Sequence, residues 1–271
     1  MINTPPACKP TPKAPSITVV TATLNALPML QHTAASIFAQ QHMPLQWIVI
    51  DGGSTDGTVE WLHSEFLRRQ DCAFLSEADG GVYHAFNKAL PYISGDWIIF
   101  LGAGDTFLSS RTLQQVAAAL PEVPESHMLA YGGVLLVDDP MADSGLSIHP
   151  SWNGVSGPWS AGRPCVPCHQ GVFHRRFLFS SGCRFDTRYR IVADGDILLG
   201  ELIRSGGTDL GMTISKMVKG GLSMNPKNRF RAIREILLIN WRSGIFWARP
   251  IYQALVFVKS ALWHFVRLPD S

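Results

Sequence analysis

Four stretches of the N-terminal part are rich in β-branched and apolar residues, a composition typical of buried strands. They are SITVVTATLN at 16–25, LQWIVID at 45–51, CAFLSEAD at 72–79 and DWIIFLGAGD at 96–105. The segments between them, 29–41, 58–69 and 82–93, carry apolar residues at helical spacing. Strands that alternate with helices form parallel sheets. The pattern therefore predicts an α/β fold, a mostly parallel, Rossmann-like sheet flanked by helices.

Polar and glycine residues gather where each predicted strand ends. They are Thr21, Thr23 and Asn25 after the first strand, Asp51, Gly52 and Ser54 after the second, Asp79 after the third, and Asp105 after the fourth. The carboxyl ends of parallel strands share one edge of a sheet, and open α/β sheets bind their ligands there. The alternative is that these residues only form turns and helix caps, for which they are well suited.

Four segments, in this order and spacing, resemble the inverting family 2 glycosyltransferases with a GT-A fold. They are ITVVTATLNA, WIVIDGGSTDGTVEWL, SEADGGVYHAFNKAL and GDWIIFLGAGD. The resemblance is closest to enzymes that build bacterial extracellular and lipopolysaccharide sugars. It runs from about residue 17 to 105 and thins out towards 200. It implies transfer of a sugar from a nucleotide-sugar donor to a glycan or a lipid-linked acceptor.

The resemblance also implies roles at the sheet edge. Asp51 would accept hydrogen bonds from the base or the ribose, and the segment from Asp79 to Lys88 would lie beside the ribose and diphosphate. Lys88 is a candidate phosphate partner, with a solvated helix lysine as the alternative. The predicted donor-binding residues are Thr21, Thr23, Asn25, Asp51, Gly52, Ser54, Asp79 and Lys88.

The turn Gly102-Ala103-Gly104-Asp105 carries one acid where the family usually has two or more. We expect Mg²⁺ or Mn²⁺ to be held by Asp105, the donor diphosphate and water, because Mg²⁺ commonly uses one or two carboxylates plus phosphates. We also expect Asp105 to be an exposed turn residue. The missing acid motivates an alternative function, a binding or regulatory module that keeps the fold but is catalytically impaired.

The acceptor side is predicted in the segment after residue 165. In the family, a carboxylate at the start of a helix here is the catalytic base, which takes the proton of the attacking hydroxyl. Asp194 matches that position best and Asp196 is second. The alternative is that Asp194 only caps the helix. His169, Gln170 and Asp196 are predicted to lie on the acceptor side.

The chain divides into a disordered lead-in at 1–15, a GT-A domain at 16–225 and a basic helical tail at 226–271. Residues 227–271 hold 8 Lys and Arg against 2 Asp and Glu. Arg242, Arg249, Lys259 and Arg267 interleave with aromatic residues, as in helices that lie on an anionic membrane. The alternative is that these helices pack on the catalytic domain.

The remaining features bear on location and partners. The first 16 residues hold five prolines and no apolar core of a signal peptide, and no stretch approaches 18 uncharged apolar residues. We therefore expect a cytoplasmic protein with reduced cysteines, in peripheral contact with the inner face of the plasma membrane. A net charge of +2 does not favour nucleic acid as a partner.

Overall fold

The computed structural model describes residues 15–149, 151–221 and 223–266, the last four of these by their backbone alone. The predicted lead-in, except for residue 15, and Arg267 lie outside the described residues.

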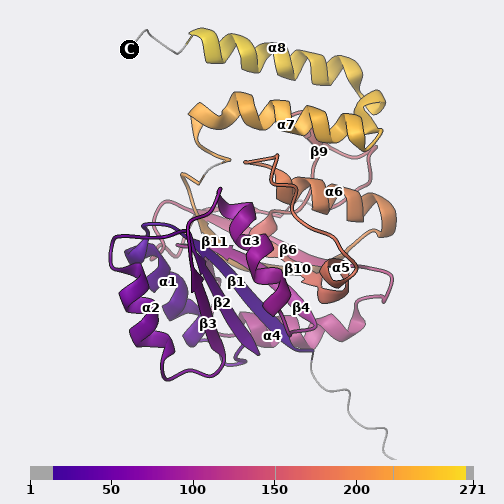
Figure 1. Cartoon of the computed structure of the whole chain (residues 1–271). Coiled ribbons are helices and arrows are strands. Elements are labelled where there is room, and N and C mark those ends of the chain that lie inside the picture. Colours follow the sequence, from indigo (N-terminus) through magenta and orange to yellow (C-terminus); the bar gives the residue numbers. More distant parts are fainter. Residues whose placement is uncertain (1–14, 150, 222, 267–271) are drawn as a thin grey trace, which may run out of the picture.

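The predicted alternation of strands and helices is confirmed in the first hundred residues (Figure 1). Its elements are β1 (Ile17–Thr23), α1 (Leu27–Phe38), β2 (Gln46–Asp51), α2 (Thr58–Phe66), β3 (Cys72–Ser76), α3 (Val82–Ala89) and β4 (Trp97–Gly102). β1 pairs in parallel with β2 and with β4, and β2 pairs in parallel with β3. The carboxyl ends of these four strands therefore meet at one edge, as the sequence predicts.

The second half of the chain extends the same sheet with mixed directions. Among the described residues the sheet has nine strands, in the order β3-β2-β1-β4-β10-β6-β11-β5, with β7 paired to β6. The added strands are β5 (Thr106–Phe107), β6 (Leu129–Val137), β7 (Leu146–Ile148), β10 (Val172–Arg175) and β11 (Thr208–Val218). β10 runs antiparallel between β4 and β6, whereas β6 and β11 are parallel. The parallel part carries the predicted ligand edge.

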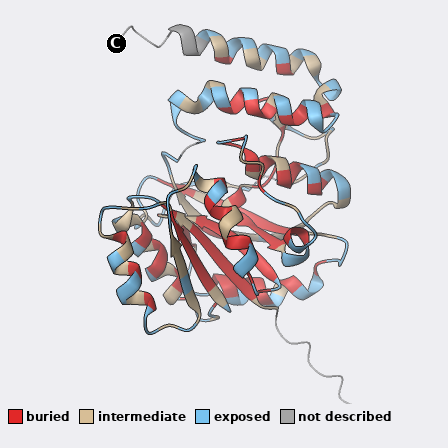
Figure 2. Cartoon of the chain, in the orientation of Figure 1, coloured by how far each residue is buried: buried red, intermediate tan, exposed pale blue. Residues whose placement is uncertain are grey.

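Both faces of the central part of the sheet are covered, so strands β1, β2, β4, β6 and β10 are almost wholly buried (Figure 2). Successive side chains of a strand point to opposite faces. Val19 accordingly belongs to a core cluster with α1, α2 and α4 (Thr112–Ala119), and Val20 to a second cluster with α3 and α6 (Ala193–Ser205). Because side chains on both faces of these strands are buried, apolar residues follow one another along the strand instead of alternating with polar ones.

Helices α6, α7 (Arg229–Arg242) and α8 (Pro250–Val266) stack on one side of the sheet, with α8 outermost (Figure 1). Ala232, Ile233, Ile236 and Ile239 of α7 join the cluster of α3 and α6. Among the described residues, no helix combines the length and the hydrophobicity needed to cross a bilayer. The predicted helical appendage is present, and α7 packs on the catalytic domain, as the alternative interpretation of the tail expects.

The shorter elements complete the chain. They are α5 (Arg176–Ser180), the hairpin of β8 (Trp159–Ser160) and β9 (Arg163–Pro164), and the 3₁₀ turns η1 (Leu90–Tyr92), η2 (Leu120–Glu122), η3 (His169–Gly171), η4 (Pro226–Asn228) and η5 (Ile245–Ala248).

Candidate active site

Asp51, the last residue of β2, is fully buried and organises the loop that follows it. Its Oδ2 accepts hydrogen bonds from the backbone N–H of Gly53 (3.0 Å) and Ser54 (2.9 Å) and from Ser76 Oγ (2.6 Å), and its Oδ1 accepts one from the Ser54 hydroxyl. Burial raises the pKa of this carboxyl, but the hydrogen bonds from Ser54 and Ser76 outweigh it and leave the pKa below its usual value. Asp51 is thus a fixed carboxylate that shapes the loop.

The loops after β1, β2 and β3 are joined by further polar contacts. Asn25 has a φ of +47°, and its Oδ1 accepts a hydrogen bond from the Thr55 N–H (2.8 Å). The Asn25 N–H donates to Ser54 Oγ at 2.7 Å. Asp79 lies against Gly52, where an added Cβ would approach Asp79 Oδ2 to 3.3 Å. The structure therefore brings Asn25, Asp51, Gly52, Ser54 and Asp79 together, and we call these residues the donor edge.

The three other residues predicted to bind the donor have different surroundings. Thr21 is fully buried, and its Oγ1 accepts a hydrogen bond from Trp47 Nε1 at 3.1 Å. The structure therefore places the Thr21 side chain in the core and not with the residues of the donor edge. Thr23 ends β1 with a buried hydroxyl that has no hydrogen-bond partner among the described residues. Lys88 is not a solvated lysine, because it forms an ion pair with Glu77 (3.0 Å) and donates to the Ala78 carbonyl (3.1 Å).

A cavity of about 390 Å³ opens beside the end of β4. Its lining includes Tyr83, Asp105, His169, Gln170 and Asp194. The structure thus brings together the predicted metal ligand, the predicted base and two predicted acceptor residues, which come from three separate segments of the chain.

Asp105 is 7% exposed, so the expectation of an exposed turn residue is wrong. The reason is a contact with α1: Thr33 Oγ1 donates to the Asp105 carbonyl (2.9 Å) and accepts a hydrogen bond from the Gly104 N–H (2.9 Å). Gly104 has a φ of +100°, which favours glycine at this bend. The Asp105 carboxylate accepts hydrogen bonds from the Gly102 N–H (2.9 Å) and from the Gln170 side chain.

Burial raises the pKa of Asp105 to about 7, although its hydrogen bonds partly oppose this. No cationic side chain pairs with this carboxylate within the described part of the chain. In the same ranges, no group of three or more His, Cys, Asp or Glu residues is arranged to hold a metal. The residues present therefore fit a cation with a single protein ligand, the buried Asp105 carboxylate. The other ligands of this cation would come from a bound diphosphate and from water.

Asp194 lies in the first turn of α6, but it does not cap the helix. The cap residue is Val192, and Asp194 Oδ1 accepts a hydrogen bond from the Tyr83 hydroxyl at 2.8 Å. That hydroxyl also lies 2.8 Å from the Ile191 carbonyl. Burial, and then the Asp194 carboxylate, raise the pKa of Tyr83 well above its usual value, so Tyr83 remains a neutral donor.

Asp196, which was predicted to lie on the acceptor side, is not among the residues that line this cavity. Successive helical residues are rotated by about 100°, so positions two apart face roughly opposite sides. Asp196 therefore faces α7, where its Oδ2 lies 3.8 Å from Arg242 Nη1. Arg242 also pairs with Asp186 (3.1 Å) and donates to the Tyr189 hydroxyl (2.9 Å).

His169 is buried and stacks on Phe100, with ring centroids 5.3 Å apart and an angle of 17° between the planes. Burial lowers the pKa of His169, against the opposing effect of Asp194, so a neutral imidazole faces the cavity. Its Nε2 has no hydrogen-bond partner in the described ranges. Gln170 contacts Asp105 rather than a separate pocket, which makes it a neighbour of the predicted metal ligand.

Glu235 of α7 is a positioning residue that sequence reasoning missed. Its carboxylate is buried and accepts hydrogen bonds from the N–H groups of Arg190 (3.1 Å), Ile191 (2.9 Å) and Val192 (3.3 Å). These groups immediately precede α6, so Glu235 fixes the start of the helix that presents Asp194. A partner 43 to 45 residues away leaves no local signal in the sequence.

Comparison with known proteins agrees with this geometry. Residues 18–127 match the family described as "Glycosyl transferase family 2". A PGL/p-HBAD biosynthesis glycosyltransferase of Mycobacterium tuberculosis is 31% identical over 184 residues, which cover 68% of each chain.

Two solved structures share the fold at low sequence identity. S. aureus TarS 1-349 in complex with UDP-GlcNAc has a TM-score of 0.57 and 16% identity, over 93% of this chain and 73% of that chain. The mannosyltransferase PcManGT from Pyrobaculum calidifontis, in complex with GDP-Man and Mn²⁺, has a TM-score of 0.58 and 17% identity, over 93% and 74%. The chain therefore belongs to glycosyl transferase family 2 and has the GT-A fold of these glycosyltransferases.

Proposed function

We propose that this glycosyltransferase inverts the configuration of the sugar that it moves from a nucleotide-sugar donor to a glycan or lipid-linked acceptor. The observation that carries the proposal is the shared cavity of Asp105 and Asp194. Asp105 is suited to hold a metal that would in turn bind the diphosphate, and Asp194 is suited to act as a base in the same cavity. The M. tuberculosis relative, whose name refers to PGL/p-HBAD biosynthesis, supports a role in making surface polysaccharide or glycolipid.

Asp194 is the proposed catalytic base. Its Oδ1 is held by Tyr83, whereas Oδ2 has no hydrogen-bond partner among the described residues and is open to take a proton. The acceptor hydroxyl loses its proton to Asp194 as its oxygen attacks the anomeric carbon from the side opposite the leaving diphosphate. The neutral His169 lines the same cavity and is the proposed hydrogen-bond partner of the acceptor sugar.

The donor edge is the proposed site of the nucleoside, and Asp105 would hold Mg²⁺ or Mn²⁺ together with diphosphate oxygens and water. When bound, this metal would stabilise the charge of the departing diphosphate. Gln170 orients the Asp105 carboxylate through their hydrogen bond. The complexes of TarS with UDP-GlcNAc and of PcManGT with GDP-Man and Mn²⁺ support this proposal.

The proposal is tested by ligand screening followed by product analysis. UDP-, GDP- and dTDP-sugars, each with and without Mn²⁺ or Mg²⁺, are compared by thermal shift, because a ligand that binds the folded state raises its melting temperature. The donor that binds is then used in transfer, and NMR coupling constants give the configuration of the new linkage. An α-linked donor should give a β-linked product, and an α-linked product would contradict inversion.

The same donors distinguish an active transferase from the alternative function, a catalytically impaired binding module. A module of this kind binds the nucleotide-sugar but releases no sugar from it, with or without metal. Release of free nucleotide at a rate that depends on Asp194 would remove this alternative.

We also propose that the enzyme works at the cytoplasmic side of the plasma membrane, in peripheral contact with anionic lipid through its C-terminal helices. The support is an exposed apolar stripe on α8, formed by Ile251, Leu255, Val258 and Leu262. Arg242 and Arg249 do not serve this purpose, because Arg242 pairs with Asp186 and Arg249 lies over the Trp159 ring.

The membrane proposal has a matched control in the chain. Ile251→Glu combined with Val258→Glu should lower sedimentation with anionic liposomes, because it places two charges on the apolar stripe. Leu67, on the opposite part of the molecule and 86% exposed, provides Leu67→Glu as the control, which should leave sedimentation unchanged. Equal sedimentation of both variants would remove the stripe from the proposal.

A further inference from the structure

A second cavity, of about 980 Å³, lies between the β8–β9 hairpin and the helices α7 and α8. Most of its wall is apolar, with Val166, Ile233, Ile236 and Val256 among the lining residues. Its size is in the range of cavities that hold drug-sized or larger ligands. The proposed transfer mechanism makes no use of it.

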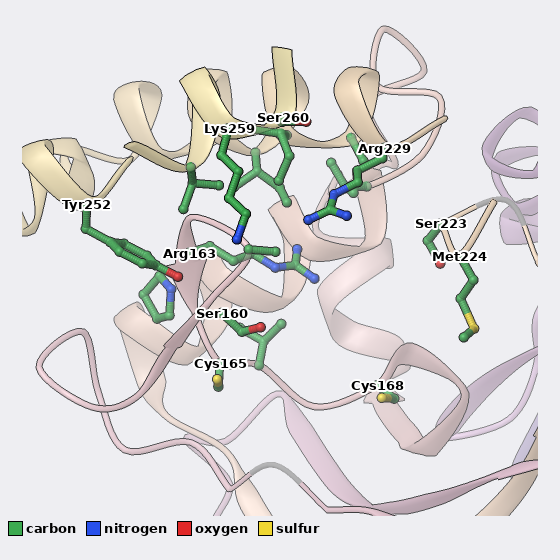
Figure 3. A pocket seen from close by; sticks show the side chains of 18 of the residues that line it. Ser160, Arg163, Cys165, Cys168, Ser223, Met224, Arg229, Tyr252, Lys259 and Ser260 are labelled. Carbon is green, nitrogen blue, oxygen red and sulfur yellow. The ribbon is translucent and has the colours of Figure 1, made fainter. Parts of the chain in front are cut away.

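Three cationic side chains point into this apolar cavity: Arg163 from β9, Arg229 from α7 and Lys259 from α8 (Figure 3). Arg163 is partly buried and Lys259 is exposed, and neither side chain has a hydrogen bond or ion pair with any described residue. No acidic side chain occurs among the described residues that line the cavity. Because a partly buried charge is normally paired, the Arg163 guanidinium, with the Lys259 ammonium lining the same cavity, is complementary to an anion.

The cavity adjoins the active site. Ser223 and Met224 line both this cavity and the smaller one that holds Asp194. The Arg163 guanidinium lies directly against Gly195, where an added Cβ would collide with Arg163 Nη1. Gly195 follows the proposed base in the first turn of α6, so an anion bound by Arg163 would lie beside the site of transfer.

We propose that this cavity binds the lipid part of the acceptor, an apolar chain that carries a phosphate group. This inference rests on the proposed function of the site at Asp194. Arg163 and Lys259 contact the phosphate, the apolar wall covers the first part of the chain, and the attached acceptor hydroxyl reaches Asp194. A neutral lipid would leave the Arg163 and Lys259 side chains unpaired, and a small anion would leave the apolar wall exposed to water, so neither matches the cavity as a whole.

Binding is measured by calorimetry on the full chain, with dodecyl phosphate below its micelle concentration as the probe. Inorganic phosphate and dodecyl maltoside, which carry the charge or the chain alone, should each bind at least about tenfold more weakly. Arg163→Gln combined with Lys259→Gln should weaken the probe by about 10- to 100-fold, since charge-assisted hydrogen bonds are lost. Arg111→Gln, at an exposed arginine near α4, should have no effect.

Two further variants separate the cavity from the outer face of α8. Ala232→Phe, which fills the cavity from α7, should also weaken the probe, whereas the double variant of Ile251 and Val258 should bind it normally. Unchanged binding after loss of both cations, or equal binding of dodecyl maltoside, would overturn the proposal. Circular dichroism of each variant confirms that the chain is folded.

Transfer assays distinguish failure of this inference from failure of the proposed function. The Arg163 and Lys259 double variant should lose transfer to a lipid phosphate acceptor but keep its affinity for the nucleotide-sugar. If the wild type bound no nucleotide-sugar, the proposed function would fail whatever the probe does. If the wild type bound donor but not dodecyl phosphate, only the lipid site would be wrong.

Discussion

The donor edge and the C-terminal helical layer, formed by α7 and α8, differ in whether their polar groups have partners within the protein. At the donor edge, Asp51 is fully hydrogen-bonded by residues of its own loop and the next strand. In the helical layer, Glu235 is also satisfied, but Lys259 of α8 and Arg163 of the adjoining β9 line a cavity without an acidic partner among the described residues. The comparison indicates that the loops of the donor edge are held by their own hydrogen bonds, whereas the cavity beside the helices retains charges that the proposed lipid phosphate would neutralise.

The largest effect is expected at Asp105, where the donor edge meets the cavity. Asp105→Asn keeps the hydrogen bond from Gly102 but removes the charge that would hold the metal, so donor turnover with Mn²⁺ should fall by roughly 10³-fold or more. Gln170→Ala, which removes only a neighbour of that carboxylate, should cost far less. Near-normal turnover of Asp105→Asn would mean that Asp105 is not the metal ligand.

The two buried carboxylates, Asp51 and Glu235, make the comparison sharper. Replacing either carboxylate residue with alanine leaves backbone N–H groups without a partner. Each replacement should lower the free energy of unfolding by roughly 2–4 kcal/mol. Their functional effects should differ: Asp51→Ala weakens nucleotide binding, whereas Glu235→Ala slows transfer at unchanged nucleotide affinity, because it disturbs the start of α6.

Urea unfolding and nucleotide titration measure both quantities. For unfolding, Asp79→Ala is the matched control, since Asp79 accepts a single backbone hydrogen bond, from Gly81 (2.8 Å). If Glu235→Ala weakened nucleotide binding as much as Asp51→Ala does, the two regions would not be separable in this way.

A smaller effect is expected at Asp186, which ties α7 to the domain. Hydrogen bonds and the charge of Arg188, together with Arg242, lower the pKa of Asp186 from 3.8 to about 2, against the effect of burial. A lowered folded-state pKa contributes stability above pH 4, and this stability is lost as the pH falls towards 2. Asp186→Asn should therefore cost about 1 kcal/mol at pH 7, because the partner arginines are exposed, and nothing near pH 2.

Thermal unfolding of the wild type and Asp186→Asn between pH 2 and 7 measures this difference. Glu122→Gln, at an exposed acid whose side chain has no hydrogen bond or ion pair with any described residue, should show no such dependence. A constant difference between wild type and Asp186→Asn over the whole range would contradict the assigned ion pairs.

The sequence could predict those parts of the site whose contacts are local. Asp51 and Asp105 follow apolar runs directly, and their hydrogen bonds to Ser54 and Gly102 span only three residues. The two-residue period of a strand already places Thr21 on the same face as Val19, and its side chain is buried there. The placement of Asp196 against Arg242 could not be predicted, because only the position of α7 shows which side of α6 is covered.

The contacts that complete the site join segments far apart in the chain. Tyr83 reaches Asp194, Thr33 reaches Asp105, and Glu235 binds the backbone just before α6. Each depends on how helices pack on the sheet, and a single sequence carries no local signal of such packing. Asp194 itself was predicted from the family resemblance, since its spacing alone does not distinguish it from Asp196.

The most direct test of the account compares Asp194→Asn with Asp196→Asn, two acids in the same helical turn. Nucleotide affinity and transfer rate are measured for both. Asp194→Asn should lose about 10²–10⁴-fold in transfer, the usual contribution of a general base, and keep its nucleotide affinity. Asp196→Asn should transfer at nearly the wild-type rate, because its carboxylate faces Arg242. A normal transfer rate in Asp194→Asn, or loss of transfer only in Asp196→Asn, would contradict the assignment of Asp194 as the base.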